Sequence, residues 1–172
     1  MFSRTLIALM LVLPGTAMAQ AASLNDAQIA HIAYTAGVID VTAGTQALSK
    51  AASPAVREFA QEMVRDHKAV NDKAIALVTK LHVTPQDNAT SQSLSKGAAD
   101  KQAELSKLSG AAFDRAYVIN EVSYHQAVND ALRTTLIPQA KNGELKALLQ
   151  TGLSLFQAHQ AHAEHLAASL KK

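Results

Sequence analysis

Side chains that commonly ligate metals fall near the middle of four separate stretches with helical periodicity. Each stretch places one of them on its apolar side, namely Asp40, His67, His125 and His159. Helical bundles build internal metal or cofactor sites from inward imidazoles and carboxylates on facing helices. The spacing therefore predicts a buried transition-metal site. The alternative that the residues leave open is a set of core histidines with hydrogen-bonded nitrogens, one of them paired with a carboxylate.

Further ligand-type residues lie close to these four. Glu121 precedes His125 by four positions and His159 precedes His162 by three, so each pair shares a helix face. Asp66 adjoins His67 and could act as a ligand or as an outer acceptor that fixes an imidazole. Nitrogen and oxygen ligands without sulfur suit iron, manganese, zinc or copper(II) and do not choose among them. The candidate metal ligands are therefore Asp40, Asp66, His67, Glu121, His125, His159 and His162.

Other kinds of chemistry have less support in the sequence. Met63 and a histidine could hold a non-covalent haem, but a single methionine on an apolar stripe favours packing. The absence of cysteine excludes disulfides, thiolate metal sites, iron–sulfur clusters and c-type haem. No nucleophile elbow or glycine-rich phosphate loop is present, so no catalytic residue is assigned. We expect His31, His82 and His165 at the surface.

The segments that must position the candidate ligands all have helical patterns. Ser23 and Asp26 resemble a capping box, and Ser53 followed by Pro54 is a strong start signal. A polar loop with Pro85 precedes a weaker helical stretch, which we interpret as a short helix within a crossover segment. The expected long helices cover about residues 23–51, 53–81, 111–138 and 144–170, and the short one covers about 93–108.

The lengths of these helices place the candidate ligands at similar depth. His67 lies fourteen residues from both Ser53 and Leu81, which is the middle of its helix at ~1.5 Å per residue. His125 and His159 are similarly central in their helices. Two helical hairpins joined by a longer segment predict an all-α fold. We expect one domain over residues 20–172, a four-helix bundle that is either up-and-down or ferritin-like with one crossover.

The first nineteen residues have the pattern of a secretory signal peptide. A basic start at Arg4, a short apolar run and a small-residue end at Ala19 predict cleavage before Gln20 and a periplasmic or secreted protein without a transmembrane anchor. Removal of Arg4 lowers the net charge of +2 by one, which gives no electrostatic reason to expect nucleic acid as a partner. Alanine-rich faces leave homo-oligomer formation open.

Several motifs along the chain resemble exported bacterial proteins of the domain of unknown function family 4142. They are the segment FAQEMVRDH ending at His67, the segment LSGAAFDRAY ending at Tyr117, the segment HQAV beginning at His125, and the late His159 followed by Leu166. This resemblance implies a ferritin-like bundle, usually periplasmic, without a settled activity. It points to Asp40, Asp66, His67, His125 and His159.

Two departures limit what the resemblance implies. The family commonly has glutamate at the position of Asp40, and often an acidic residue where this chain has Tyr124. Di-iron carboxylate bundles also use a glutamate three residues before a histidine, and this chain has no such pair. A site richer in histidine is therefore expected, and the number of metal ions stays open. The leading hypothesis is an exported bundle that binds a transition metal through some subset of Asp40, His67, His125 and His159, with Asp66, Glu121 and His162 as auxiliaries. The alternatives are a metal-free bundle for envelope stress or protein interaction, and a metal-dependent oxidase or peroxide-consuming enzyme.

Overall fold

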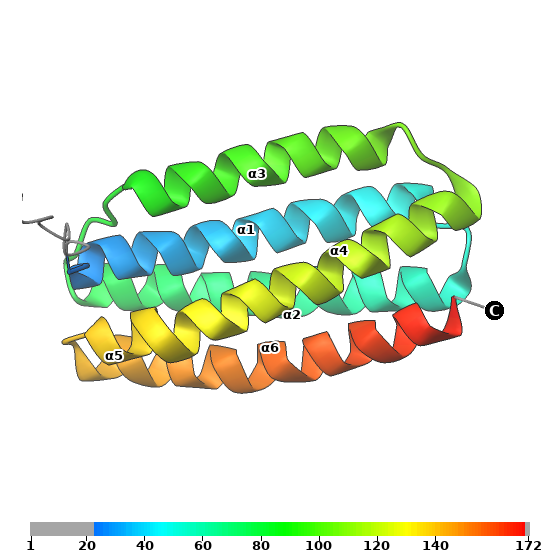
Figure 1. Ribbon diagram of the computed structural model, residues 1–172. Coiled ribbons are helices and arrows are strands. Elements are labelled where there is room, and N and C mark those ends of the chain that lie inside the picture. Colours follow the sequence, from blue (N-terminus) through cyan, green and yellow to red (C-terminus); the bar gives the residue numbers. More distant parts are fainter. Residues whose placement is uncertain (1–22, 171–172) are drawn as a thin grey trace, which may run out of the picture.

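The computed structural model describes residues 23–170, and within that range every regular element is helical (Figure 1). The predicted signal peptide, residues 1–19, lies outside the described residues. No helix within 23–170 combines the length and apolar character needed to cross a membrane. The elements are α1 (Asp26–Lys50), α2 (Pro54–Lys80), α3 (Ala89–Ser106), α4 (Gly110–Ala131), the π-helix η1 (Leu132–Leu136), α5 (Ile137–Gln139) and α6 (Gly143–Ser169).

Four long helices form the bundle as two antiparallel hairpins, α1 with α2 and α4 with α6 (Figure 1). The α2 and α6 helices join the two hairpins on one side, and α1 and α4 face each other on the other. The α3 helix returns along the outside of α1, so α2 and α4 run in the same direction. The all-helical bundle expected from the sequence is confirmed, and its connectivity contains one crossover.

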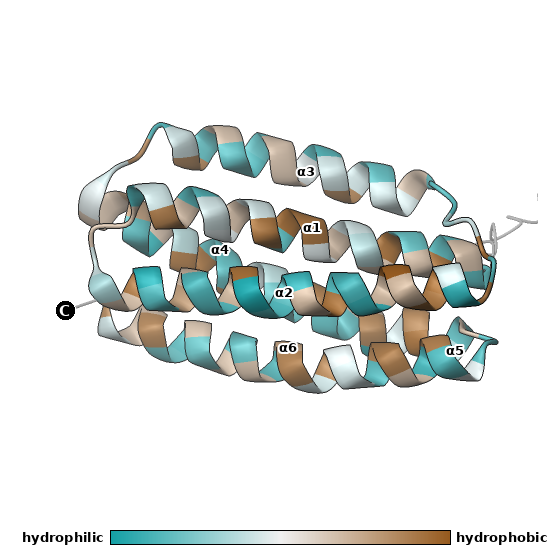
Figure 2. Ribbon diagram, turned by 180° about the vertical axis from the view of Figure 1, so that it is seen from behind, coloured by the Kyte–Doolittle hydropathy of each residue, from teal (hydrophilic) through white to brown (hydrophobic). Residues whose placement is uncertain are grey.

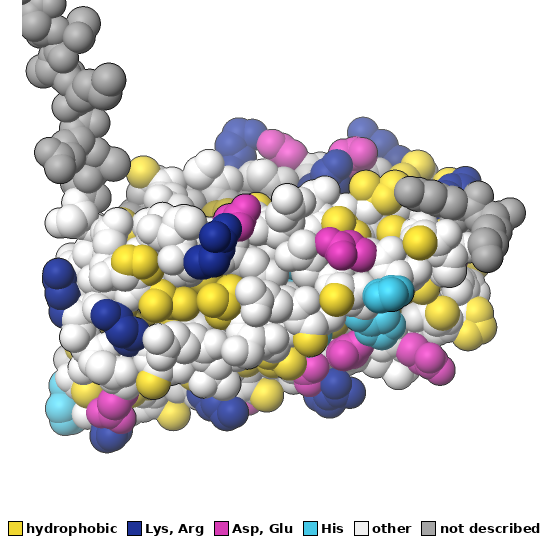
Figure 3. All heavy atoms as spheres, turned by 60° about the horizontal axis from the view of Figure 1, so that its bottom comes forward, with side chains coloured by type: hydrophobic (Ala, Val, Ile, Leu, Met, Phe, Trp, Pro, Cys, Tyr) yellow, Lys and Arg dark blue, Asp and Glu magenta, His cyan; other side chains and the backbone are white. Residues whose placement is uncertain are grey.

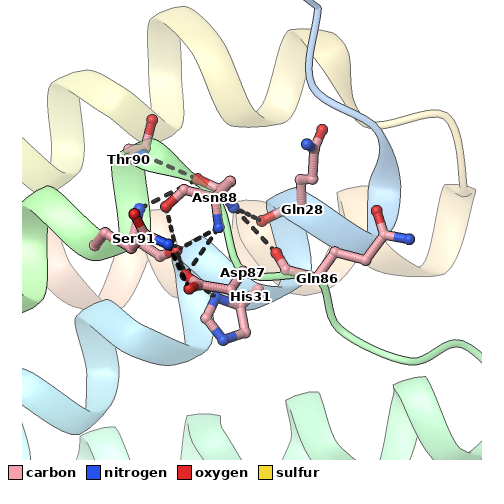
Figure 4. A network of polar contacts seen from close by, with 8 residues as sticks. Gln28, His31, Gln86, Asp87, Asn88, Thr90 and Ser91 are labelled. Carbon is pink, nitrogen blue, oxygen red and sulfur yellow. Dashed lines mark hydrogen bonds and ion pairs between the residues drawn. The ribbon is translucent and has the colours of Figure 1, made fainter.

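The crossover helix is longer than expected. The sequence predicted a short helix over 93–108, whereas α3 has 18 residues and begins at Ala89. Asn88 supplies the missing start signal, because its side chain accepts hydrogen bonds from the backbone N–H groups of Thr90 and Ser91 (Figure 4). The same side chain donates to the carbonyl of Gln28, which attaches the start of α3 to α1.

The start of α1 also uses a different cap from the one predicted. Asn25, not Ser23, caps the helix through a reciprocal capping box with Gln28. Asp26 instead accepts hydrogen bonds from the backbone N–H groups of Lys141 and Asn142 at 2.7 and 2.8 Å. The first turn of α1 therefore holds the loop that precedes α6.

At the opposite end of the bundle, a buried carboxylate also accepts hydrogen bonds from the backbone of a connecting turn. Asp114 in α4 accepts the backbone N–H groups of Ala52 and Ser53 at 3.0 and 2.8 Å. The α2 helix begins at Pro54 as predicted, but the Ser53 hydroxyl makes no capping hydrogen bond. The turn between α1 and α2 is thus fixed by a residue from the second half of the chain, at a separation no local motif could indicate.

The core consists of two apolar clusters separated by a polar layer. One cluster surrounds Phe59, Met63 and Tyr117, and the other surrounds Ile29 and Leu149. Brown, hydrophobic bands recur along α1, α2 and α6, whereas α3 is paler and more hydrophilic (Figure 2). The polar layer lies at the middle of the bundle, between the two clusters. It consists of five buried residues, Asp40, His67, Glu121, His125 and His159.

Candidate metal centre

The polar layer brings together five of the seven residues singled out in the sequence. The α1 helix provides Asp40, α2 provides His67, α4 provides Glu121 and His125, and α6 provides His159. Each of these residues is at most 2% exposed. Their similar depth follows from helical rise, as the sequence predicted, and the short turns keep the four helices in register. Four helices therefore meet at one buried polar centre.

Asp40 lies between two imidazoles. Its Oδ2 atom is 3.2 Å from Nε2 of His67 and 3.5 Å from Nε2 of His125. The His67 and His125 ring centroids are 5.6 Å apart, and the His159 ring lies 5.3 and 5.5 Å from them. One ligand atom from each of the three histidines falls within 4.8 Å of the others. The three imidazoles and the carboxylate thus converge on one small volume.

A backbone contact fixes the protonation of the His125 ring. Nδ1 of His125 lies 3.0 Å from the carbonyl oxygen of Glu121, which can only accept a hydrogen bond. Nδ1 therefore carries the hydrogen, and Nε2 presents its lone pair toward Asp40. Glu121 also places a carboxylate oxygen 3.6 Å from Nδ1 of His125. Its carboxylate, Asp40 and His125 form a second group whose ligand atoms lie within 4.8 Å of one another.

The His159 ring is oriented from outside the centre. Its Nε2 atom lies 3.1 Å from Oδ2 of Asp66, and Arg65 holds the same carboxylate through two hydrogen bonds of 2.7 and 3.1 Å. Partial burial alone would raise the pKa of Asp66, but the hydrogen bonds from Arg65 and His159 outweigh it and keep that pKa below its usual value. Asp66 is therefore an ionised acceptor. Nε2 of His159 carries the hydrogen, and Nδ1 keeps its lone pair.

Atoms at the centre are buried without hydrogen-bond partners in the described part of the chain. They include both carboxylate oxygens of Asp40 and both ring nitrogens of His67. The other buried atoms without a hydrogen-bond partner are Nε2 of His125, Nδ1 of His159 and Oε2 of Glu121. Buried polar atoms in native proteins are almost always paired, and an unpaired one costs about 1–3 kcal/mol. The buried histidine and carboxyl groups of this layer could hold a metal ion between them.

Burial sets the protonation states of the centre. It lowers the pKa of His67 to about 2, with further lowering by His125 and His159, and it lowers the pKa of His125 to about 4. The same loss of solvent raises the pKa of Asp40 to about 7 and that of Glu121 well above its usual value, and the charge of Asp40 adds to the effect on Glu121. The histidines are consequently neutral near pH 7, which is the form that ligates metals.

The distances around Asp40 match the edges of a metal coordination shell. Metal–nitrogen bonds of ~2.0–2.1 Å separate neighbouring ligand atoms by about 2.9 Å in an octahedron and about 3.3 Å in a tetrahedron. The observed separations from Asp40 Oδ2 to the two histidines are 3.2 and 3.5 Å. Each of these two separations is compatible with a pair of ligands on one first-row transition ion, and His67, His125 and His159 form a group whose ligand atoms lie within 4.8 Å of one another.

Two of the predicted candidates lie outside the buried centre. His162 is 47% exposed in its side chain and contacts Glu62 through a 2.7 Å interaction between Nδ1 and Oε2. Asp66 stands between this surface pair and His159, and its side chain is 17% exposed. Exposed histidine and acidic side chains also adjoin one another in the space-filling view (Figure 3). Asp66 therefore has the position of an outer acceptor, and His162 that of a surface residue.

Sequence reasoning missed two residues that support the centre. Phe156 stacks on the His67 ring with centroids 4.5 Å apart and planes 9° apart, and Arg65 holds Asp66. The position of Phe156 three residues before His159 was a usable signal, because that spacing puts both on one face of α6. Tyr124, where the resemblance led us to expect an acidic residue, donates a 2.8 Å hydrogen bond to the carbonyl of Ala36.

The remaining histidines and Met63 lie where the sequence placed them. His82 and His165 are exposed, and partly exposed His31 lies 3.8 Å from Asp87. Met63 is fully buried in an apolar cluster, in keeping with a packing role. These positions leave the polar layer as the one group of buried histidines within residues 23–170.

Comparison with known proteins agrees with the resemblance noted in the sequence. No curated protein and no solved structure gives a match. The family described as Domain of unknown function (DUF4142) matches residues 12–166, which is nearly the whole chain. The match spans all five residues of the polar layer and the two motifs of α2 and α4. The chain therefore belongs to this family, and its buried histidine and carboxylate groups could hold a metal ion.

Proposed function

We propose that the protein binds one transition-metal ion in the polar layer, through His67, His125 and His159, whose ligand atoms lie within 4.8 Å of one another, and through Asp40, which lies beside His67 and His125. Glu121 lies beside Asp40 as an auxiliary carboxyl group. The observation that carries this proposal is the convergence of orphaned ligand atoms at coordination distances. A metal ion would supply partners for these buried atoms, since each one left unpaired costs about 1–3 kcal/mol.

The outer contacts support the same proposal. Histidine ligands usually donate their second ring N–H to a carbonyl or carboxylate, which fixes the ring and its tautomer. His125 does so to the carbonyl of Glu121, and His159 does so to Asp66. In both rings the nitrogen without a hydrogen is the one that is buried without a partner. The nitrogen and oxygen donors suit zinc, iron, manganese or copper(II).

Metal analysis of purified protein tests the proposal. We expect about one equivalent of metal by plasma mass spectrometry after zinc loading, and saturable binding by calorimetry at about pH 7.5. The double variant His67→Leu, His125→Leu should bind less than about a tenth of an equivalent. His162→Asn is the matched control, because this histidine lies outside the polar layer. Wild-type protein that binds no more metal than the double variant would contradict the proposal.

We also propose that the protein acts after export. The basic start, short apolar run and small-residue end of residues 1–19 support a signal peptide, with a mature chain that begins at Gln20. Expression of the full sequence in bacteria should yield a periplasmic protein whose amino terminus is Gln20. Retention of Met1 on protein recovered from the cytoplasm would contradict this assignment.

A further inference from the structure

A cleft of about 970 Å³ lies between α1, α3 and α4 and reaches the polar layer from one side. Asp40 and Glu121 are among the residues that line it, whereas His67 and His159 are not. The α3 helix covers the cleft loosely, because Ser91 and Leu105 are its two buried residues. The polar layer therefore has a carboxylate side next to a cleft and an imidazole side packed against α2 and α6.

The walls of the cleft are largely apolar. Val38, Ile39 and Ala43 line it from α1, and Leu94 and Ala98 line it from α3. Its polar side chains are mostly neutral, such as Thr42, Gln46 and Asn120. Lys101 is the one lysine or arginine along the cleft within the described residues. The volume and the mainly apolar surface are those of sites for small organic molecules, which range over about 300–1,000 Å³.

The innermost polar atoms of the cleft are carboxyl oxygens. Asp40 Oδ1 and Glu121 Oε2 are buried and have no hydrogen-bond partner in residues 23–170. Asp40 contacts both histidines through Oδ2, so Oδ1 remains free to accept a hydrogen bond. A ligand that donates hydrogen bonds would satisfy these oxygens, whereas a carboxylate head group would bring further acceptor oxygens into a poorly solvated site.

We propose that this cleft binds a small organic molecule with an amine or hydroxyl head group on an apolar body. The head group lies at Asp40 and Glu121, and the body packs against Leu94 and Ala98 of α3. This inference goes beyond metal binding, because the walls that select the apolar body are separate from the imidazole ligands. It places an organic ligand next to the proposed metal ion.

Three probes of similar size and different head group test the preference. Benzylamine, benzyl alcohol and benzoate are titrated into ¹⁵N-labelled protein, both metal-free and zinc-loaded. We expect benzylamine and benzyl alcohol to shift amide signals of residues 35–43, 94–102 and 120–124, and to bind at least about tenfold more tightly than benzoate. Because the metal-free protein is titrated as well, failure of zinc to bind would count against the metal proposal alone.

Variants that fill the cleft provide the second arm. Ala98 shares an inward stripe with Leu94 and Leu105, so Ala98→Phe should weaken benzylamine binding by about tenfold or more. Thr42→Phe narrows the cleft from α1 and serves if the α3 variant unfolds. Ala103→Phe on the exposed side of α3 is the control, and we expect no change. Three results would overturn the proposal. Benzoate could bind as tightly as benzylamine, or binding could fail to saturate by about 10 mM. The shifted signals could also lie mainly around Leu148 and Leu149, which line the neighbouring apolar cavity and not the cleft.

Discussion

Asp40 determines how the polar layer responds to pH. Burial raises its pKa from 3.8 to about 7, so between these values the folded protein holds a proton that the unfolded chain has lost. Stability from this group is therefore complete below about pH 4 and is lost as the pH rises to about 7. A metal ion offsets the loss, because it favours the ionised carboxylate.

The variant Asp40→Asn separates ligand from structural roles. An amide resembles the protonated carboxyl, so the metal-free variant should match wild type at about pH 5. At about pH 8 the variant should be more stable by on the order of 1–3 kcal/mol, because it avoids a buried charge, and it should not bind metal. Urea unfolding at both pH values measures the difference. A variant that is less stable than wild type at the higher pH would show that the ionised Asp40 stabilises the metal-free fold.

Asp66 should affect metal binding without ligating the metal. Its ionised carboxylate keeps the hydrogen on Nε2 of His159, so Asp66→Asn should lower metal affinity by about 10–100-fold with little change in the number of bound ions. Glu62→Gln is the matched control, since Glu62 contacts the surface residue His162. Calorimetric titration of both variants provides the comparison, and equal losses in the two would argue against a specific role for Asp66.

At the residue level, the sequence predicted which side chains meet but not how they are paired. Helical periodicity and the distance to the nearest turn were enough to bring Asp40, His67, His125 and His159 together. Whether a given side chain points into the polar layer or out of it depends on how its helix is rotated about its own axis, to within a fraction of a turn. For this reason the three auxiliary candidates could not be told apart from the sequence, and of these Glu121 is buried in the polar layer whereas Asp66 and His162 lie outside it.

The packing of α1 against α2 depends on a glycine at the helix contact. A Cβ atom at Gly44 would lie 2.9 Å from Val64 Cγ2 and 3.1 Å from the Ala60 carbonyl oxygen, whereas one at Gly97 in α3 would contact nothing within 4 Å. Gly44→Ala should therefore lower stability by about 1–2 kcal/mol through overpacking. Gly97→Ala should raise it by about 0.5–1 kcal/mol through helix preference. Thermal unfolding of the two variants measures both changes in stability, which we expect to have opposite signs although the substitution is the same.

At the element level, the sequence predicted the long helices and the helix of the crossover segment, but not where that crossover helix begins. Strong stripes and the Ser53-Pro54 signal defined the long helices to within a few residues. The α3 helix lacks a wide apolar stripe because it packs on the bundle from outside, so its start was predicted near residue 93 and lies at Ala89. Pro138 also falls within the final helical turn, after the π-helix η1, and does not end α4 sharply.

In the whole molecule, a bound ion would join four helices at mid-length. Binding to the folded state alone stabilises by about 2.7 kcal/mol at a free ligand concentration about one hundred times the dissociation constant. Amides of α1, α2, α4 and α6 that exchange through global unfolding should therefore exchange about a hundredfold more slowly in zinc. Hydrogen exchange followed by mass spectrometry measures this change. If zinc slowed amide exchange in only one hairpin, the ion would not be bound by both hairpins.

Both ends of the bundle depend on carboxylates from distant parts of the chain. Asp114 receives the amides of the turn between α1 and α2, and Asp26 receives those of the loop before α6. During synthesis the first hairpin therefore emerges with two turn amides that only water can satisfy until Asp114 has left the ribosome. A fragment ending before α4 would lack that acceptor permanently. The first hairpin therefore gains the acceptor for its turn only from the second half of the polypeptide.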